Sequence, residues 1–316
     1  MIQYLSLDDV SLEDACLTIG TFDGLHRGHQ EIIRQLTAGA LESGAPAVVL
    51  TFRPPPSVVL GKREQAQYLT SPDELAALLE GMGVDVLIIH PFDRALAALS
   101  AREFIEILKV RLRFRALWIG YDFAMGRDRQ GDAAALEKLG LELGYRLRII
   151  PAVEVDGDAI SSSQIRARIA EGEVAEAARM LGRPYRLEGV VVRGEGRGKS
   201  IGIPTANLSV PADRALPGNG VYVCRAQVAG ESLGAAANIG VRPTFDGQGA
   251  RVTIEAHLLD FDGDLYGESL SLEFLRRLRG ERRFPDAQAL VAQILADIAE
   301  ARQVLMMDAP SGPPQN

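Results

Sequence analysis

The spacing of apolar residues changes abruptly near residue 186, and this change limits the possible folds more than any other feature of the chain. Before it, short apolar runs rich in β-branched residues alternate with segments of helical periodicity. The runs cover residues 47–52, 84–90, 115–120 and 145–150. Continuous apolar strands separated by helices are typical of a parallel sheet covered on both faces. The first half of the chain therefore predicts an α/β domain.

Helices are predicted between these strands, over residues 29–42, 73–82 and 101–110. The second has Ser71 as a plausible cap and Pro72 in its first turn, both of which favour a helix start.

From residue 186 onward, short strands are separated by turns that contain glycine, which is typical of an antiparallel barrel or sandwich. Gly182 and Pro184 end the preceding helical segment, so the domain junction is predicted within residues 182–187. A last amphipathic helix, over about residues 286–305, is expected to pack on the strands. The residues after it are expected to form a frayed tail.

The composition narrows the classes of function. A chain of 316 residues is long enough for two domains, and 47% hydrophobic with 24% charged residues is ordinary for a globular protein. The net charge of −8 argues against a broad nucleic-acid surface, so small-molecule partners are expected. The chain has neither a secretion signal nor an apolar run long enough to span a membrane, which predicts a cytoplasmic protein. Cys16 and Cys224 are too far apart to suggest a disulfide framework.

The segment TFDGLHRGHQ contains two of the four histidines of the chain, His26 and His29. It follows a strand that ends near Gly20, and a helix is expected to begin near Gly28. A glycine-containing loop and a helix N-terminus at the carboxyl edge of a parallel sheet attract phosphate, and both imidazoles can reach the same anion. Alternatively, the two histidines only cap the helix. A zinc site is disfavoured because His90 and His257 supply no recognisable ligand set.

GTFDGLHRGHQ resembles the signature of nucleotidyltransferases whose His-x-Gly-His motif binds the phosphates of ATP, and ISSSQIR, residues 160–166, resembles their second signature. The hydroxyls of ISSSQIR and the guanidinium fork of Arg166 also suit phosphate on chemical grounds. The resemblance implies charge stabilisation by His26, His29 and Arg166. It implies nucleotide contacts from Gly20, Phe22, Asp23, Gly24, Gly28, Ser161, Ser162 and Ser163.

The second half contains GEGRGKSIGIPTANL, residues 194–208. A P-loop needs glycine five residues before Gly198, where Arg193 stands, so that interpretation fails. Thr205 and Asn207 lie two apart on an extended segment and point the same way, so they could share a hard cation such as Mg²⁺. Taken alone, such a pair usually belongs to a turn or a strand edge.

The whole run is similar to the flavokinase domain of bacterial bifunctional riboflavin kinases and FAD synthetases. Three later segments, residues 237–245, 254–267 and 274–284, are similar to it as well. The resemblance implies a Rossmann-like nucleotidyltransferase domain with a parallel sheet over residues 1–183. An antiparallel β-barrel flavokinase domain with a terminal helix follows over 184–307, and a disordered tail over 308–316.

This family resemblance assigns roles to residues of the second half. It places Thr205 and Asn207 at Mg²⁺ and the phosphates of ATP, and it makes Glu255 the base that takes the proton from the terminal ribityl hydroxyl of riboflavin. Glu255 stands on the polar face of a predicted strand, where a carboxylate is usually only solvated. The flap and substrate contacts implied by the resemblance are Gly198, Lys199, Gly202 and Pro204, with Asp122 and Phe123 on the flavin side of the first domain.

Three positions depart from the family pattern. Pro55 stands where the family has histidine, Ser163 where threonine is commoner, and Met125 where an aromatic residue is usual. Serine keeps the hydroxyl, whereas Pro55 removes a hydrogen-bond donor and puts the efficiency of adenylyl transfer in question.

The expected activity is phosphorylation of riboflavin to FMN, followed by adenylylation of FMN to FAD, with riboflavin, FMN and ATP as partners. A kinase with a decayed or altered transferase half, and a flavin-binding module without turnover, are the alternatives. The sequence leaves a homo-oligomer open.

Overall fold

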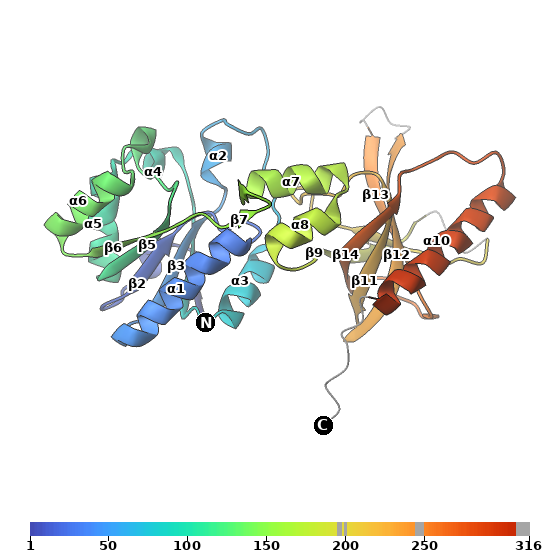
Figure 1. Cartoon of the computed structure of the whole chain (residues 1–316), viewed down its shortest axis with the longest axis horizontal. Helices are drawn as coiled ribbons and strands as arrows, with labels where there is room; N and C mark the ends of the chain where they lie inside the picture. The colour runs from blue at the N-terminus through green and yellow to red at the C-terminus, as the bar shows by residue number, and fades with distance from the viewer. Residues whose placement is uncertain (195–197, 199–200, 244–249, 308–316) are drawn as a thin grey trace, which may run out of the picture. The chain divides into compact units, whose positions relative to one another are not determined.

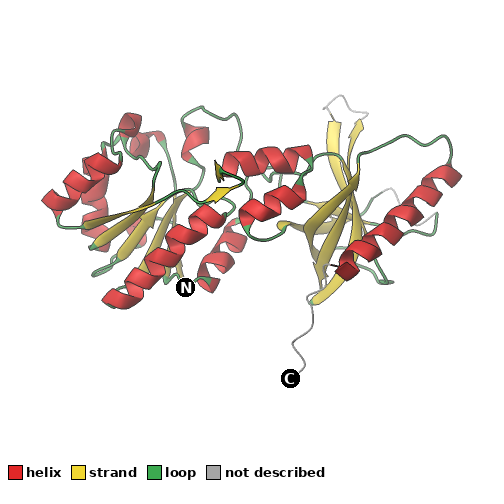
Figure 2. Ribbon diagram, in the orientation of Figure 1, coloured by secondary structure: helices red, strands yellow, loops and turns green. Residues whose placement is uncertain are grey.

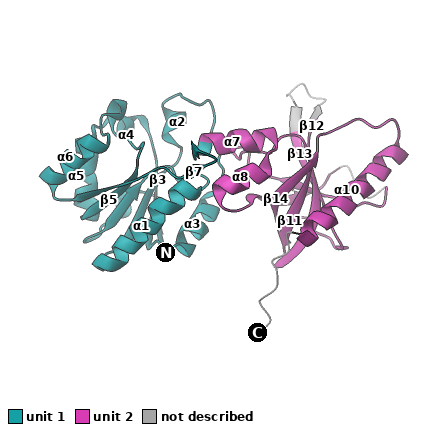
Figure 3. Ribbon diagram, viewed as in Figure 1, with its two compact units in different colours: residues 1–162 teal, residues 163–316 magenta. Residues whose placement is uncertain are grey.

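The computed structural model describes residues 1–194, 198, 201–243 and 250–307. The chain forms two compact units, Met1–Ser162 and Ser163–Asn316, which Figure 3 shows in different colours. Within the described residues, no helix combines the length and the apolar character needed to cross a membrane. The predicted tail, residues 308–316, lies outside the described residues.

A six-stranded sheet forms the centre of the first unit (Figure 1). Its strand order is β1-β4-β3-β2-β5-β6, and every pair is parallel. The strands are β1 (Ile2–Tyr4), β2 (Cys16–Ile19), β3 (Ala47–Phe52), β4 (Val86–His90), β5 (Ala116–Gly120) and β6 (Arg146–Ile150). The predicted parallel sheet is confirmed.

Helices connect these strands (Figure 2). They are α1 (Arg27–Ser43), α2 (Pro56–Val59), α3 (Pro72–Gly81), α4 (Arg94–Ala98), α5 (Ala101–Leu112) and α6 (Ala133–Leu143). The short elements are the 3₁₀ turns η1 (Leu7–Asp9) and η2 (Arg127–Arg129), and the hairpin of β7 (Glu154–Val155) and β8 (Asp158–Ala159). The predicted helix start after Ser71 is confirmed, because Ser71 and Glu74 form a reciprocal capping box there.

Two hydrophobic layers cover the sheet because successive side chains of a strand point to opposite faces. Leu17 belongs to a cluster that includes Ile105 of α5 and Leu136 of α6. Its neighbour Cys16 belongs to a second cluster that includes Ile33 of α1 and Leu79 of α3. A sheet buried on both faces explains why its strands are continuously apolar in sequence.

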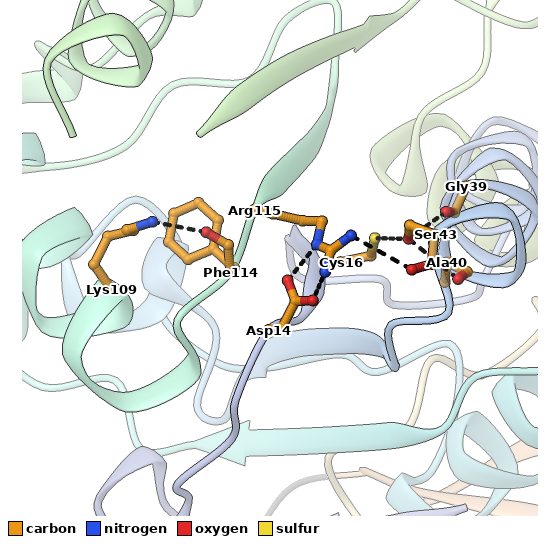
Figure 4. A network of polar contacts seen from close by, with 8 residues as sticks. All are labelled: Asp14, Cys16, Gly39, Ala40, Ser43, Lys109, Phe114 and Arg115. Atoms are coloured by element: carbon orange, nitrogen blue, oxygen red, sulfur yellow. Dashed lines mark hydrogen bonds and ion pairs between the residues drawn. The ribbon is translucent and has the colours of Figure 1, made fainter. Parts of the chain in front are cut away.

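Polar contacts hold together the amino-terminal ends of β2 and β5, opposite the edge where the histidine motif lies (Figure 4). Arg115 pairs with Asp14, and its Nη1 donates to the carbonyl of Ser43 over 3.4 Å. The Ser43 hydroxyl donates to the Gly39 carbonyl over 2.7 Å and lies 3.5 Å from Cys16 Sγ. These contacts fix the C-terminal end of α1 against the start of β2 and β5.

The second unit contains a closed antiparallel barrel in the order β10-β13-β12-β11-β14-β9. Its strands are β9 (Tyr185–Val192), β10 (Ala206–Ser209), β11 (Gly220–Val228), β12 (Glu231–Pro243), β13 (Ala250–Leu258) and β14 (Ser269–Arg279). Tyr185, Tyr222 and Phe274 are fully buried, and the centroid of the Phe274 ring lies 6.4 Å from that of Tyr185 and 5.4 Å from that of Tyr222. Of the two predicted antiparallel architectures, the barrel is therefore the correct one.

The predicted terminal helix is α10 (Ala287–Met307), which packs on the barrel. The buried carboxylate of Asp297 anchors it, because Arg279 at the end of β14 donates to Asp297 Oδ2 from Nη2 over 2.7 Å and to Oδ1 from Nε over 3.0 Å. A buried carboxylate needs such a partner to offset the cost of desolvation.

Two helices precede the barrel, α7 (Ser162–Glu171) and α8 (Val174–Leu181). Arg277 of β14 donates to the Glu171 carbonyl over 3.1 Å, and the Gly218 amide donates to the Ile169 carbonyl over 3.0 Å. These contacts join α7 to the second unit, and α8 packs on β14 and β9 of the same unit. The boundary between the two functional domains at residues 183 and 184 stays a prediction.

Candidate active sites

The order of strands reverses at β2, which lies between β3 and β5. In open α/β sheets, ligands bind outside the carboxyl ends of the strands at such a switch point. The histidine motif follows β2, the Thr-Phe-Arg-Pro-Pro-Pro loop follows β3, and Asp122 follows β5. The topology therefore brings three predicted segments to one edge of the sheet.

The loop between β2 and α1 has an unusual backbone. Phe22, Gly24 and Leu25 have φ angles of 44°, 81° and 38°, a region that non-glycine residues rarely adopt. Burial of the two side chains offsets the cost of this backbone conformation, because Phe22 and Leu25 are each only 1% exposed. A Cβ at Gly20 would lie 3.1 Å from the Phe22 ring, so glycine there lets the ring pack under the loop.

The two histidines of the motif lie against each other at the N-terminus of α1. His26 is the N-cap, and its Nδ1 accepts from the His29 amide over 3.4 Å. The rings stack with centroids 3.6 Å apart, and a Cβ at Gly28 would lie 3.2 Å from the His26 ring. Burial and the neighbouring His26 lower the pKa of His29 well below its usual value, so its imidazole is neutral near pH 7.

The buried Nδ1 of His29 has no hydrogen-bond partner among the described residues. Such an atom in a native structure calls for an explanation, and an incoming ligand is one. His90 differs, since its Nδ1 accepts from the Leu7 amide over 3.1 Å. In the described part of the chain, no group of three or more His, Cys, Asp and Glu side chains is arranged to hold a metal ion.

Asp23 and Ser162 join segments that are distant in the sequence. Asp23 is 7% exposed, and its Oδ1 accepts from the amides of Leu69 and Thr70 over 2.9 and 3.2 Å. The Ser162 hydroxyl donates to the Asp23 carbonyl over 2.9 Å. Ser162, the first residue of α7, is therefore tied to the histidine loop. The hydrogen bonds of the Asp23 carboxylate join the histidine loop to the segment of Leu69 and Thr70.

The remaining residues of the second signature lie around the start of α7. Ser161 precedes the helix, Ser163 is exposed in its first turn, and Arg166 is half-buried one turn later.

The segment after β5 combines exposed and buried positions. Asp122 is exposed, whereas Phe123 packs against the core of the first unit. Met125 is 8% exposed and joins the same core, and it exchanges two backbone hydrogen bonds with Gly131. The departure at Met125 is therefore a change within a hydrophobic core.

The Thr-Phe-Arg-Pro-Pro-Pro loop lies beside a small pocket. Pro55 is the N-cap of α2 and offers no side-chain hydrogen bond there. The Arg53 guanidinium lies 3.9 Å from the centroid of the Tyr68 ring, and both line the pocket together with Asp23 and Thr70. Sequence reasoning missed Arg53 and Tyr68, because the stack forms between segments that the chain pattern does not relate.

In the barrel, the strand register places Glu255 between two asparagines. Glu255 of β13 pairs with Asn207 of β10 on one side and with Asn238 of β12 on the other. Side chains directly opposite on neighbouring strands share a face, with Cβ atoms about 5 Å apart. Asn238 was not among the predicted site residues, although it lies in a segment that the resemblance covered. The register could have found it only once the strand pairing was known.

The segment before β10 contains the remaining residues that the resemblance assigns to the flavokinase site. Thr205 immediately precedes the strand, and a Cβ at Gly198 would lie 3.1 Å from its hydroxyl and 2.4 Å from the Ile203 carbonyl. The carbonyl of exposed Pro204 accepts from His257 Nδ1 over 2.8 Å. Gly202 has a φ of 76°, which favours glycine. Lys199 lies outside the described residues.

Replacing Gly194 with alanine is expected to lower FMN formation about 10- to 10²-fold through a small displacement in the site. A Cβ at Gly194 would lie 2.2 Å from Asn207 Nδ2, so the amide must move. Steady-state kinase rates would measure the effect. The matched control is Gly81→Ala, where a Cβ meets no atom within 4 Å. Equal rates for both variants would show that the position of Asn207 is unimportant.

Comparisons with known proteins identify the family of the chain. A family model described as FAD synthetase matches residues 8–164, and one described as riboflavin kinase matches residues 181–305. The bifunctional riboflavin kinase/FMN adenylyltransferase of Pseudomonas fluorescens is 41% identical over 90% of this chain and 91% of its own length. The enzyme of the same name from Escherichia coli is 37% identical over 97% of each chain.

Among solved structures, one described as a macrolide-efflux protein from Streptococcus pneumoniae has a similar fold. Its TM-score is 0.87 at 32% identity, and the match covers 95% of this chain and 98% of the other. The matches to both family models and to the full-length relatives lead to one conclusion. The chain belongs to the bifunctional riboflavin kinase/FMN adenylyltransferase family, with the two transferase activities of that family.

Proposed function

We propose that the barrel transfers a phosphoryl group from ATP to riboflavin and that the first unit transfers the adenylyl group of a second ATP to FMN, using the residues described above. The observation that carries the proposal is that one chain holds two separate groups of side chains whose chemistry suits phosphate transfer. One is Glu255 between Asn207 and Asn238, and the other is the stacked pair of His26 and His29.

In the kinase reaction, Glu255 accepts the proton of the terminal ribityl hydroxyl as its oxygen attacks the γ-phosphorus of ATP. The bond from that phosphorus to the bridging oxygen breaks, and ADP leaves. Phosphoryl transfer depends on in-line positioning and charge neutralisation, so no covalent intermediate is required. Glu255 is half-buried on the barrel surface, where its carboxylate can meet a substrate hydroxyl.

The hydroxyl of Thr205 and the amide oxygen of Asn207 suit Mg²⁺, which prefers hard oxygen ligands and shares them with phosphates. Gly198 lies against the Thr205 hydroxyl and Gly194 against the Asn207 amide, and neither glycine has a side chain that would crowd these groups. This open space supports the fit of Mg²⁺ to Thr205 and Asn207. Bound Mg²⁺ would neutralise charge on the ATP phosphates. Thr205 and Asn207 orient it, while Glu255 handles the proton.

In the adenylyl transfer, a phosphate oxygen of FMN attacks the α-phosphorus of ATP, and pyrophosphate leaves. His29 is neutral, so its ring supplies one N–H donor and one acceptor nitrogen. The amide groups at the start of α1 add a partial positive charge at the same place. Together with the Ser161 hydroxyl, these groups stabilise charge on the phosphates of the transition state.

Removing divalent cations with EDTA is expected to abolish both activities, because the ATP phosphates then lack a counter-ion. Excess Mg²⁺ should restore them. Asn207→Ala should raise the Mg²⁺ concentration needed for half-maximal FMN formation without changing the requirement of FAD formation. Rates that resist EDTA would contradict the magnesium proposal.

The direct test incubates the protein with riboflavin, ATP and Mg²⁺ and follows riboflavin, FMN and FAD by chromatography, with a parallel reaction started from FMN. FMN should appear first and FAD after it, and supplied FMN should also become FAD. FMN without FAD in either reaction would favour a kinase with an altered transferase half, the alternative that Pro55 supports. No product would favour a flavin-binding module.

A further inference from the structure

The buried hydroxyl of Thr70 connects the histidine loop to the segment before α3. Its Oγ1 accepts from the Gly24 amide over 3.1 Å and lies 3.4 Å from Asp23 Oδ1, to which it donates. Thr70 is 4% exposed and Asp23 7%, so water does not compete for these groups. One threonine hydroxyl thus satisfies a loop amide and a loop carboxylate.

The hydrogen bond from Gly24 to Thr70 lies in a stretch of strained backbone. The Gly24 amide belongs to a stretch in which Phe22, Gly24 and Leu25 all have positive φ angles. Strained conformations of this kind persist only when the surrounding contacts over-determine them. The amides of Leu69 and Thr70, which both donate to Asp23 Oδ1, complete the clamp.

The clamp ends two residues before the stacked imidazoles. Leu25 connects Gly24 to His26, and its carbonyl accepts from the Gln30 side chain of α1 over 2.8 Å. The position of Gly24 therefore sets where the helix begins and where the rings of His26 and His29 lie. A misplacement of about 1 Å at such a site can cost 10²-fold in rate.

We propose that Thr70 is a positioning residue for adenylyl transfer, which holds the loop of Phe22 to Leu25 so that His26 and His29 are in place before the nucleotide arrives. Asp23 is the second half of the clamp. This inference rests on the proposed adenylyltransferase function of the first unit.

The test compares Thr70→Val, which removes the hydroxyl at nearly constant shape, with Thr70→Ser, which keeps it. The kcat for FAD formation from supplied FMN should fall about 10- to 10²-fold in the valine variant, with KM for ATP and FMN within about twofold. The serine variant should recover most of the rate. FMN formation from riboflavin should be unchanged in both, since its site lies in the other unit.

The matched control is Thr18→Val. The Thr18 hydroxyl is fully buried and donates to the Trp118 carbonyl over 2.8 Å, away from the loop. Its loss should lower the melting temperature without changing kcat. Thr70→Ala replaces the valine variant if that protein does not fold.

Equal kcat values for Thr70→Val and the unsubstituted protein would overturn the inference alone, and so would equal losses in the two valine variants. An unsubstituted protein that makes no FAD from FMN would overturn the proposed function as well, which separates the two failures.

Discussion

Replacing Glu255 with glutamine is expected to lower FMN formation about 10²- to 10⁴-fold, the range for loss of a general base. Glutamine keeps the shape of the side chain between Asn207 and Asn238 but cannot accept the proton of the ribityl hydroxyl. The effect should fall on kcat, because the hydroxyl can still be bound. Initial rates from riboflavin, resolved by chromatography, would measure it.

The second activity of the Glu255→Gln variant is an internal control, because adenylylation of supplied FMN should continue at the normal rate. Glu231→Gln changes an exposed glutamate at the first residue of β12 and should leave both rates unchanged. Undiminished FMN formation by the Glu255 variant would show that another group takes the proton.

The second large effect is expected for His29→Ala, which should reduce FAD formation about 10²- to 10³-fold, the scale for one transition-state donor. The substitution removes the neutral imidazole that stacks on His26 and leaves the first turn of α1 without its ring. Rates of FAD formation from supplied FMN would measure the loss, while phosphorylation of riboflavin should remain nearly intact.

His90→Ala is the matched control, since it removes an imidazole at the end of β4 that accepts from the Leu7 amide. It should cost stability without lowering the rate of adenylylation. A comparable fall of both activities in His29→Ala would mean that the assignment of activities to the two units is wrong.

Local patterns were sufficient to predict most of the architecture. Ser71 and Pro72 marked the start of α3 because a capping hydroxyl and a first-turn proline act within a few residues of each other. The continuous apolar strands predicted a sheet buried on both faces for the same reason. The short β1 was missed, since its residues Ile2–Tyr4 carry no periodic pattern and gain their place by pairing with β4.

The geometry of the sites depends on contacts that no local pattern encodes. The pairing of Glu255 with Asn238 follows from the register of β12 and β13, and sequence reasoning could nominate Glu255 only through its family motif. Asp23 was predicted to contact the nucleotide, and that stays a prediction. The hydrogen bonds that its carboxylate accepts from the amides of Leu69 and Thr70 could not be predicted. Those residues are more than forty positions away, and nothing in the spacing connects them.

We propose that two independent sites in one chain act in sequence through FMN. The most direct test mixes equal amounts of the Glu255→Gln and His29→Ala proteins and supplies riboflavin, ATP and Mg²⁺. Each variant alone should make little FAD, whereas the mixture should make it steadily, because FMN released by the His29 variant is adenylylated by the Glu255 variant. A mixture that makes no more FAD than the sum of its parts would contradict the account.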